Sequence, residues 1–140
     1  MTLSIFQNEK DRKGLLGTCA VSVFSSRFLA VFSLVYNMFS HGVHSPFMTF
    51  LFAWPLLLCA VPAGICLLVP KMPGPSILSS LFWQTGTAAV TVSSLLRGIF
   101  DIAGNSSVYQ SALMAAGFLF LACGAILYFA AVFIVRKTQQ

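Results

Sequence analysis

Apolar residues dominate this chain in four long runs, which short segments rich in glycine, proline or polar residues separate from one another. The runs cover about 15–39, 47–69, 77–100 and 108–135. A helix needs roughly 20 apolar residues to cross about 30 Å of hydrocarbon, and each run is long enough. The pattern therefore predicts an all-α integral membrane protein, a four-transmembrane-helix antiparallel bundle with up-down-up-down topology.

The third run differs from the others because polar residues recur along it at helical spacing. Intervals of four and three residues place on one helix face Ser80, Gln84, Thr87, Thr91, Ser94, Gly98 and Asp101. The other faces are apolar, so we expect this polar face to turn toward other helices or a hydrated cavity. Arg97 and Asp101 are four residues apart at the end of the run, and this spacing predicts an ion pair between them.

The composition separates this chain from soluble proteins. Of its 140 residues 58% are hydrophobic and only 8% are charged, whereas about a quarter of the residues of a soluble domain are charged. We therefore expect residues 1–140 to form a single membrane domain surrounded by the lipid bilayer, with 1–14 as a cytoplasmic tail whose mixed charged and apolar residues suit a short interfacial turn of helix. Four spans leave no room for a separate catalytic or nucleic-acid-binding module.

The net charge of +5 reflects topology rather than a nucleic-acid surface. Lys and Arg near the ends of spans stay on the cytoplasmic side. Most of these residues fall in the N-terminal tail, the middle loop and the C-terminal tail, namely Lys10, Arg12, Lys13, Lys71, Arg136 and Lys137. Both termini are therefore predicted to be cytoplasmic, in a plasma membrane or a bacterial inner membrane, and nucleic acid is not an expected partner.

Arg27 interrupts the first run and leaves two positions for the start of the span. If the span begins near Leu15, Arg27 lies deep in the membrane and must snorkel or find a partner. If it begins near Phe28, Arg27 is an anchor at the inner surface, and the preceding residues lie along the interface as an amphipathic helix. We favour the first arrangement, a long tilted span.

Two further patterns concern how the helices pack. In the second run Pro55 and Pro62 each remove an intrahelical hydrogen bond, which predicts a kink near its middle. The fourth run is rich in small residues, and Gly117, Gly124 and Ala131 recur every seven residues. They form a narrow seam where another helix, from the same chain or from another, can approach closely.

Candidate chemistry is sparse. His41 and His44 are spaced so that a helix would let them share a metal ion, but the surrounding glycine and proline favour a turn, and neither a carboxylate nor a thiol is near. We therefore expect no metal site. The chain has no serine nucleophile elbow, HExxH motif, phosphate-binding glycine loop or dinucleotide fingerprint. Neither an enzyme nor a cofactor is expected.

These patterns predict a small multi-pass membrane protein that acts as a transporter or channel subunit for an ion or small solute. Four spans enclose little space, so chains would associate as a homo-oligomer, with the polar face of the third run along the path. The alternative is a non-catalytic accessory or scaffold subunit that binds another membrane protein through helix–helix packing, with hydroxyl groups worth roughly 0.6 kcal/mol each. Gln84 and Asp101 favour transport, because packing seams mostly use Gly, Ala and Ser.

Overall fold

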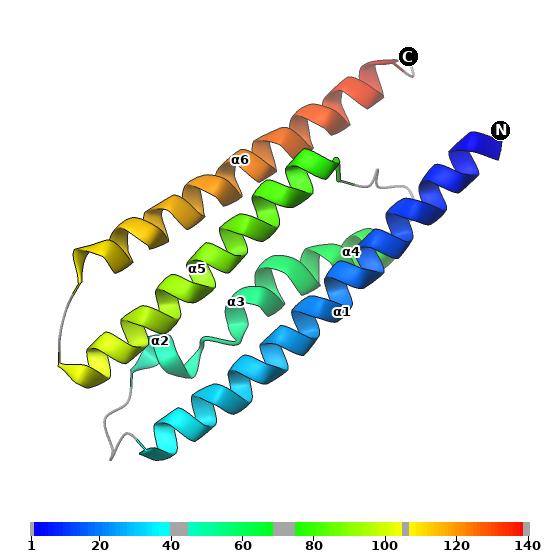
Figure 1. The fold of residues 1–140 in the computed structure, drawn as a ribbon. Helices are drawn as coiled ribbons and strands as arrows, with labels where there is room; N and C mark the ends of the chain where they lie inside the picture. Colours follow the sequence, from blue (N-terminus) through cyan, green and yellow to red (C-terminus); the bar gives the residue numbers. More distant parts are fainter. Residues whose placement is uncertain (1, 40–44, 69–74, 105–106, 139–140) are drawn as a thin grey trace.

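The structure, a computed structural model, describes residues 2–39, 45–68, 75–104 and 107–138, which form a helical bundle of four main segments (Figure 1). The all-α prediction is confirmed. The elements in chain order are α1 (Thr2–Phe39), α2 (Pro46–Thr49), α3 (Ala53–Pro55), the π-helical turn η1 (Leu56–Ala60), α4 (Val61–Leu68), α5 (Ile77–Ala103) and α6 (Val108–Thr138). We call residues 46–68, from α2 to α4, the second segment. Consecutive segments run in opposite directions, so α1 begins and α6 ends at the same end of the bundle (Figure 1).

The ends of α5 follow local capping chemistry. Ser76 precedes the helix in an extended conformation, and its hydroxyl oxygen accepts a hydrogen bond from the Ser79 amide at 3.3 Å. At the other end Gly104 adopts a left-handed conformation with φ 68°, which glycine takes without steric cost. The first helix is longer than expected, because α1 begins at Thr2 and thus includes the residues predicted to be a cytoplasmic tail. It continues without a break through Arg27.

Two helices in the described part of the chain are long and apolar enough to cross a membrane, Arg12–Phe39 within α1 and Val108–Ile134 within α6. The second segment supplies a shorter apolar helix, Ala53–Leu68. Helix α5 has 27 residues, but hydroxyl side chains interrupt its apolar character. Residues along much of its length are buried, namely Ser79, Gly86, Thr87, Val90, Ser93, Ser94 and Gly98. The hydroxyl-rich helix α5 therefore has several of its polar residues covered by its neighbours.

Helices α5 and α6 pack closely through two rows of small or polar residues spaced by seven. The row on α5 is Ser79, Gly86 and Ser93, and the facing row on α6 is Gly124, Gly117 and Gln110. A Cβ atom added at Gly86 would come within 2.8 Å of the Leu121 amide nitrogen and 2.9 Å of the Gly117 carbonyl oxygen. One added at Gly117 would come within 2.9 Å of the Val90 amide nitrogen. Only glycine fits at these two positions at this helix separation.

Hydrogen bonds complete this interface at both ends. The Ser79 hydroxyl donates to the Gly124 carbonyl at 2.8 Å, and the Ser93 hydroxyl donates to the Gln110 carbonyl at 2.7 Å. The Gln110 side-chain amide returns a bond to the Ser93 oxygen at 3.4 Å. These buried polar groups therefore have partners, as a dry interface requires.

The second segment is irregular because of its prolines. Pro55 and Pro62 flank the π-helical turn η1, near the middle of the run where the sequence predicts a kink. Pro62 has no N–H to bond the carbonyl of Leu58, four residues earlier. The indole N–H of Trp83 on α5 donates to this carbonyl instead. The proline thus creates an acceptor through which the second segment is fixed to α5.

Helix α1 packs on the second segment rather than on the backbone of α5. Near the end of α1, the Ser33 hydroxyl donates to the Met48 carbonyl of α2 at 2.7 Å. In its first half, the Cys19 thiol lies 3.9 Å from the Ala60 carbonyl oxygen of η1. The second segment therefore stands between the first helix and the α5–α6 pair and separates α1 from α5.

A Gly117→Ala substitution tests the close approach of α5 and α6. We expect it to lower the free energy of unfolding by about 1–3 kcal/mol, the usual cost of overpacking. Gly64→Ala on α4 is the matched control, because an added Cβ there meets no atom within 4 Å. Unfolding in detergent, followed by circular dichroism, measures both. Equal stability of the two variants would contradict the contact.

A Trp83→Phe substitution tests the bond to the second segment. It keeps an aromatic ring but leaves the Leu58 carbonyl without its donor, so we expect a loss of about 1–3 kcal/mol. Trp54→Phe is the control, since the Trp54 ring packs edge-on against Phe118 at 6.3 Å between centroids, a contact that phenylalanine can keep. The same unfolding measurement applies, and a loss no larger than that of the control would rule out the bond.

Candidate functional site

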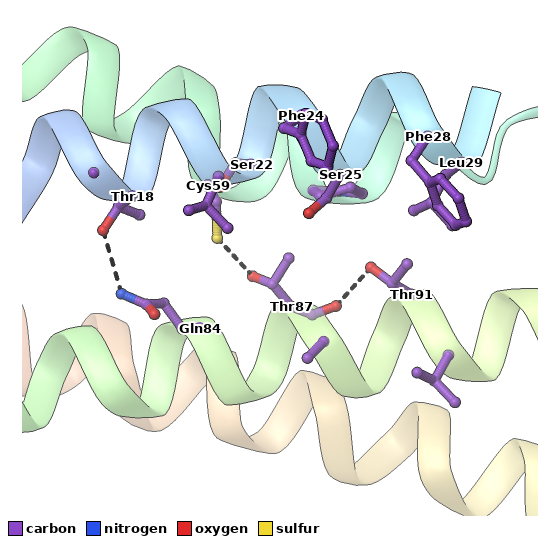
Figure 2. A pocket seen from close by; sticks show the side chains of 15 residues that line it. Thr18, Ser22, Phe24, Ser25, Phe28, Leu29, Cys59, Gln84, Thr87 and Thr91 are labelled. Atoms are coloured by element: carbon purple, nitrogen blue, oxygen red, sulfur yellow. Dashed lines mark hydrogen bonds between the residues drawn. The ribbon is translucent and has the colours of Figure 1, made fainter. Parts of the chain in front are cut away.

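A groove of about 570 Å³ lies between α1 and α5, with the second segment at its base (Figure 2). Pro55 and Cys59 line it from the second segment. The α5 side is formed by Gln84, Thr87, Ala88, Thr91 and Val92, and the α1 side by Gly17, Thr18, Val21, Ser22, Phe24, Ser25, Phe28 and Leu29. None of the described residues that line the groove is charged. The groove surface is mainly apolar, with uncharged hydroxyl, amide and thiol groups set into it.

The hydroxyl groups on the α5 side already donate their protons within the protein. Thr91 donates to the Thr87 carbonyl at 2.8 Å, and Thr87 donates to the Trp83 carbonyl at 2.9 Å. The Thr87 oxygen in turn lies 3.3 Å from the thiol of Cys59, which donates to it (Figure 2). What Thr91 offers to the groove is therefore the acceptor capacity of its oxygen.

The facing side of α1 also carries hydroxyl groups, which the sequence reading missed. Thr18, Ser22 and Ser25 follow one another at intervals of four and three, so they lie on one face of α1. Figure 2 shows Thr18 and Ser25 directed toward α5. This helical spacing of hydroxyl residues could have indicated a second polar face from the sequence alone. However, α1 carries further serines on another face, such as Ser33, and spacing alone does not tell which face meets the polar side of α5.

A second cavity of about 330 Å³ adjoins the groove toward the end of the bundle where α1 begins. Its lining is mainly apolar and includes Trp83 of α5 and Tyr128 of α6. Thr18, Cys59 and Gln84 line both spaces. The Gln84 side-chain amide donates to the Thr18 oxygen at 3.4 Å and to the Ser80 oxygen at 3.0 Å. This bridge between α1 and α5 therefore lies where the two cavities meet.

The other end of the polar face is covered by α2. A Cβ at Gly98 would lie 3.0 Å from Met48, and the Ser94 hydroxyl donates to the Phe47 carbonyl at 3.3 Å. The Asp101 carboxylate accepts a bond from the Ser45 hydroxyl at 2.9 Å. The seven residues predicted to share one face thus divide into a part that lines the cavities and a part that holds α2.

Arg97 contributes to the same attachment of α2. Its guanidinium carbon lies 4.1 Å from the centroid of the Phe47 ring, a cation–π arrangement. In the described structure Arg97 thus contacts the Phe47 ring of α2, and Asp101 accepts a hydrogen bond from Ser45, the residue before α2. An ion pair between Arg97 and Asp101 stays a prediction.

The remaining predicted residues lie away from the groove. Gly117 and Gly124 are buried against α5, and Ala131 is half-buried further along α6. His41 and His44, the weak metal candidates, fall outside the described residues. The residues that the structure brings together are therefore Thr18, Gln84, Thr87 and Thr91, with Cys59 between them.

A Gly98→Ala substitution tests whether α2 is seated directly on α5. The added methyl group would press against the Met48 backbone nitrogen at 3.1 Å, so α2 should detach more often. We expect amide exchange in Met48, Thr49 and Phe50 to accelerate about tenfold, equivalent to about 1.4 kcal/mol. Hydrogen–deuterium exchange measures this, with α6 peptides as the internal control. Unchanged exchange in α2 would contradict the contact.

The groove is the feature of this chain from which a function can be argued. Comparison with protein-family models, curated proteins and solved structures found no match for this chain. Among the described residues no group of three or more His, Cys, Asp or Glu side chains is placed to hold a metal ion. The chemistry that the described site offers is hydrogen bonding by uncharged groups beside apolar surface.

Proposed function

We propose that this chain is a small multi-pass membrane protein and a subunit of a transporter or channel for a small solute. The observation that carries the proposal is the pair of hydroxyl-bearing faces on α1 and α5, which face each other across a groove of about 570 Å³. Polar side chains are costly beside lipid and mark solute pathways when they line a cavity. A mainly apolar groove with hydroxyl and amide groups and no charged side chain among its described lining residues fits an uncharged solute.

The proposed membrane arrangement has four spans, both termini cytoplasmic and a location in a plasma membrane or bacterial inner membrane. Two of the spans are supported by the length and apolar character of α1 and α6. The antiparallel order of the segments supports the placement of the ends of the chain on one side (Figure 1). In this arrangement α5 is the third span, screened from lipid on several sides by its neighbours.

The lining favours a solute that donates hydrogen bonds. Thr91 offers an acceptor oxygen, and Gln84 adds its side-chain carbonyl oxygen, because both protons of its amide nitrogen are already donated to Thr18 and Ser80. Phe24, Phe28 and Val92 give the same groove an apolar side. A small polyol has hydroxyl groups that donate to the acceptor oxygens and carbon atoms that pack on the apolar side of the groove. Glycerol is therefore a suitable probe.

Glycerol uptake by vesicles that contain the purified protein tests the proposal. We expect faster uptake than in empty vesicles, and a loss of about fivefold in Thr91→Val, because one hydrogen bond of about 1 kcal/mol is removed at unchanged size. Gln84→Leu should act in the same direction. Thr85→Val is the matched control, because Thr85 is exposed on the same helix and lines neither cavity.

Native mass spectrometry of the same variants shows whether assembly is affected. Transport predicts that Thr91→Val lowers uptake while the number of subunits stays the same. If Thr91→Val instead dissociates the assembly, or if uptake equals that of empty vesicles, the polar face is a packing surface. The chain would then be an accessory subunit bound to another membrane protein.

A further inference from the structure

Arg27 lies on a surface of α1 that no other described segment covers. The side chain is exposed and is not among the residues that line the groove. Exposed residues recur along this side of α1 at intervals of four and three, namely Ala20, Phe24, Arg27, Val31, Leu34 and Met38, of which Phe24 also lines the groove. We call this row the Arg27 stripe. Such spacing is typical of a helix that receives another helix along its length.

Contacts between the helices place Arg27 near the middle of the bundle. Thr18 bonds Gln84, and Ser33 bonds Met48, which in turn lies against Gly98. Because α1 and α5 run in the same direction, both contacts put Arg27 level with residues 92–93, near the centre of α5. Arg27 is also about 18 Å from the end of α1 at Phe39, counting 1.5 Å per residue. An arginine side chain is much shorter than that distance.

The acidic residues of the chain are not at this level. The sequence has three, Glu9, Asp11 and Asp101. The first two lie on α1 about four turns or more before Arg27, and Asp101 lies near the far end of α5, where it accepts a bond from Ser45. A second copy in the same orientation would present its acidic residues at the same levels. Neither this chain nor a parallel copy supplies a carboxylate opposite Arg27.

We propose that the Arg27 stripe binds a transmembrane helix of a different protein that carries an aspartate or glutamate at mid-depth. The inference rests on the membrane placement proposed above, though not on transport. A guanidinium in hydrocarbon requires an opposite charge or water, and a carboxylate at the same depth forms two parallel hydrogen bonds with it. The apolar residues on both sides of Arg27 then pack against the partner helix, and the charge pair sets its register.

A synthetic helix can serve as the test partner. The protein, labelled with a fluorescent donor, is inserted in phosphatidylcholine vesicles with acceptor-labelled leucine-rich peptides of about 21 residues. One peptide has glutamate at its centre, one has glutamate near an end and one has leucine throughout. We expect at least tenfold tighter association with the central-glutamate peptide than with the other two. Flotation with the vesicles establishes membrane insertion independently.

Variants of the chain identify the group responsible. Arg27→Leu should reduce association to the level of the all-leucine peptide, whereas Arg27→Lys should retain part of it, because lysine keeps the charge but cannot form both parallel hydrogen bonds. Arg12→Leu is the matched control, because Arg12 is an exposed arginine of the same helix far from its middle. Glycerol uptake should be unchanged in Arg27→Leu, so a protein that binds the peptide without transporting glycerol would contradict only the proposed transport.

Three results would overturn the proposal. The first is equal binding of the central-glutamate peptide by the native chain and by Arg27→Leu. The second is energy transfer between differently labelled copies of the native chain that Arg27→Leu abolishes, which would make a second copy the occupant of the Arg27 stripe. The third is loss of the preference for glutamate when phosphatidylglycerol replaces part of the phosphatidylcholine, which would assign Arg27 to lipid phosphate.

Discussion

The close contact between α5 and α6 determines the roles of the other surfaces of α5. Gly86 and Gly117 let the two backbones meet with no room for a Cβ atom, and serine hydroxyls close the contact at both ends. One row of small and polar residues on α5 is buried in this interface. The second polar row of α5, which includes Gln84 and Thr91, lines the groove instead. A helix with polar groups on two sides is thereby accommodated in a largely apolar bundle.

The second segment explains why that second row faces a groove rather than another helix. Its prolines prevent a regular helix, and the carbonyl that Pro62 leaves without a partner accepts the Trp83 indole N–H. The segment is thus fixed to α5 on one side and to α1 on the other, through Ser33 and Cys19. Because it stands between these helices, their polar faces are separated by open space, which only the Gln84–Thr18 bond crosses among the hydrogen bonds described here.

Much of the fold was predictable because local rules determine it. The apolar runs, the cap at Ser76 and the positive-φ Gly104 define the ends of α5, and helical spacing identified its polar face. Pairing between helices was not predictable. The match of Ser79, Gly86 and Ser93 with Gln110, Gly117 and Gly124 requires knowing that α6 returns beside α5. The seating of Met48 on Gly98 was likewise not predictable, because it is a contact between residues distant in the sequence.

A nitroxide scan along α5 in vesicles tests the central claim most directly, because collision rates with oxygen and with a water-soluble nickel complex distinguish lipid, water and protein. The account predicts nickel accessibility at 84, 88 and 91, oxygen accessibility at 81 and 85, and neither at 79, 86 and 93, where α5 meets α6. Oxygen accessibility without nickel accessibility at 84, 88 and 91 would show that this face meets lipid, and it would contradict a hydrated groove.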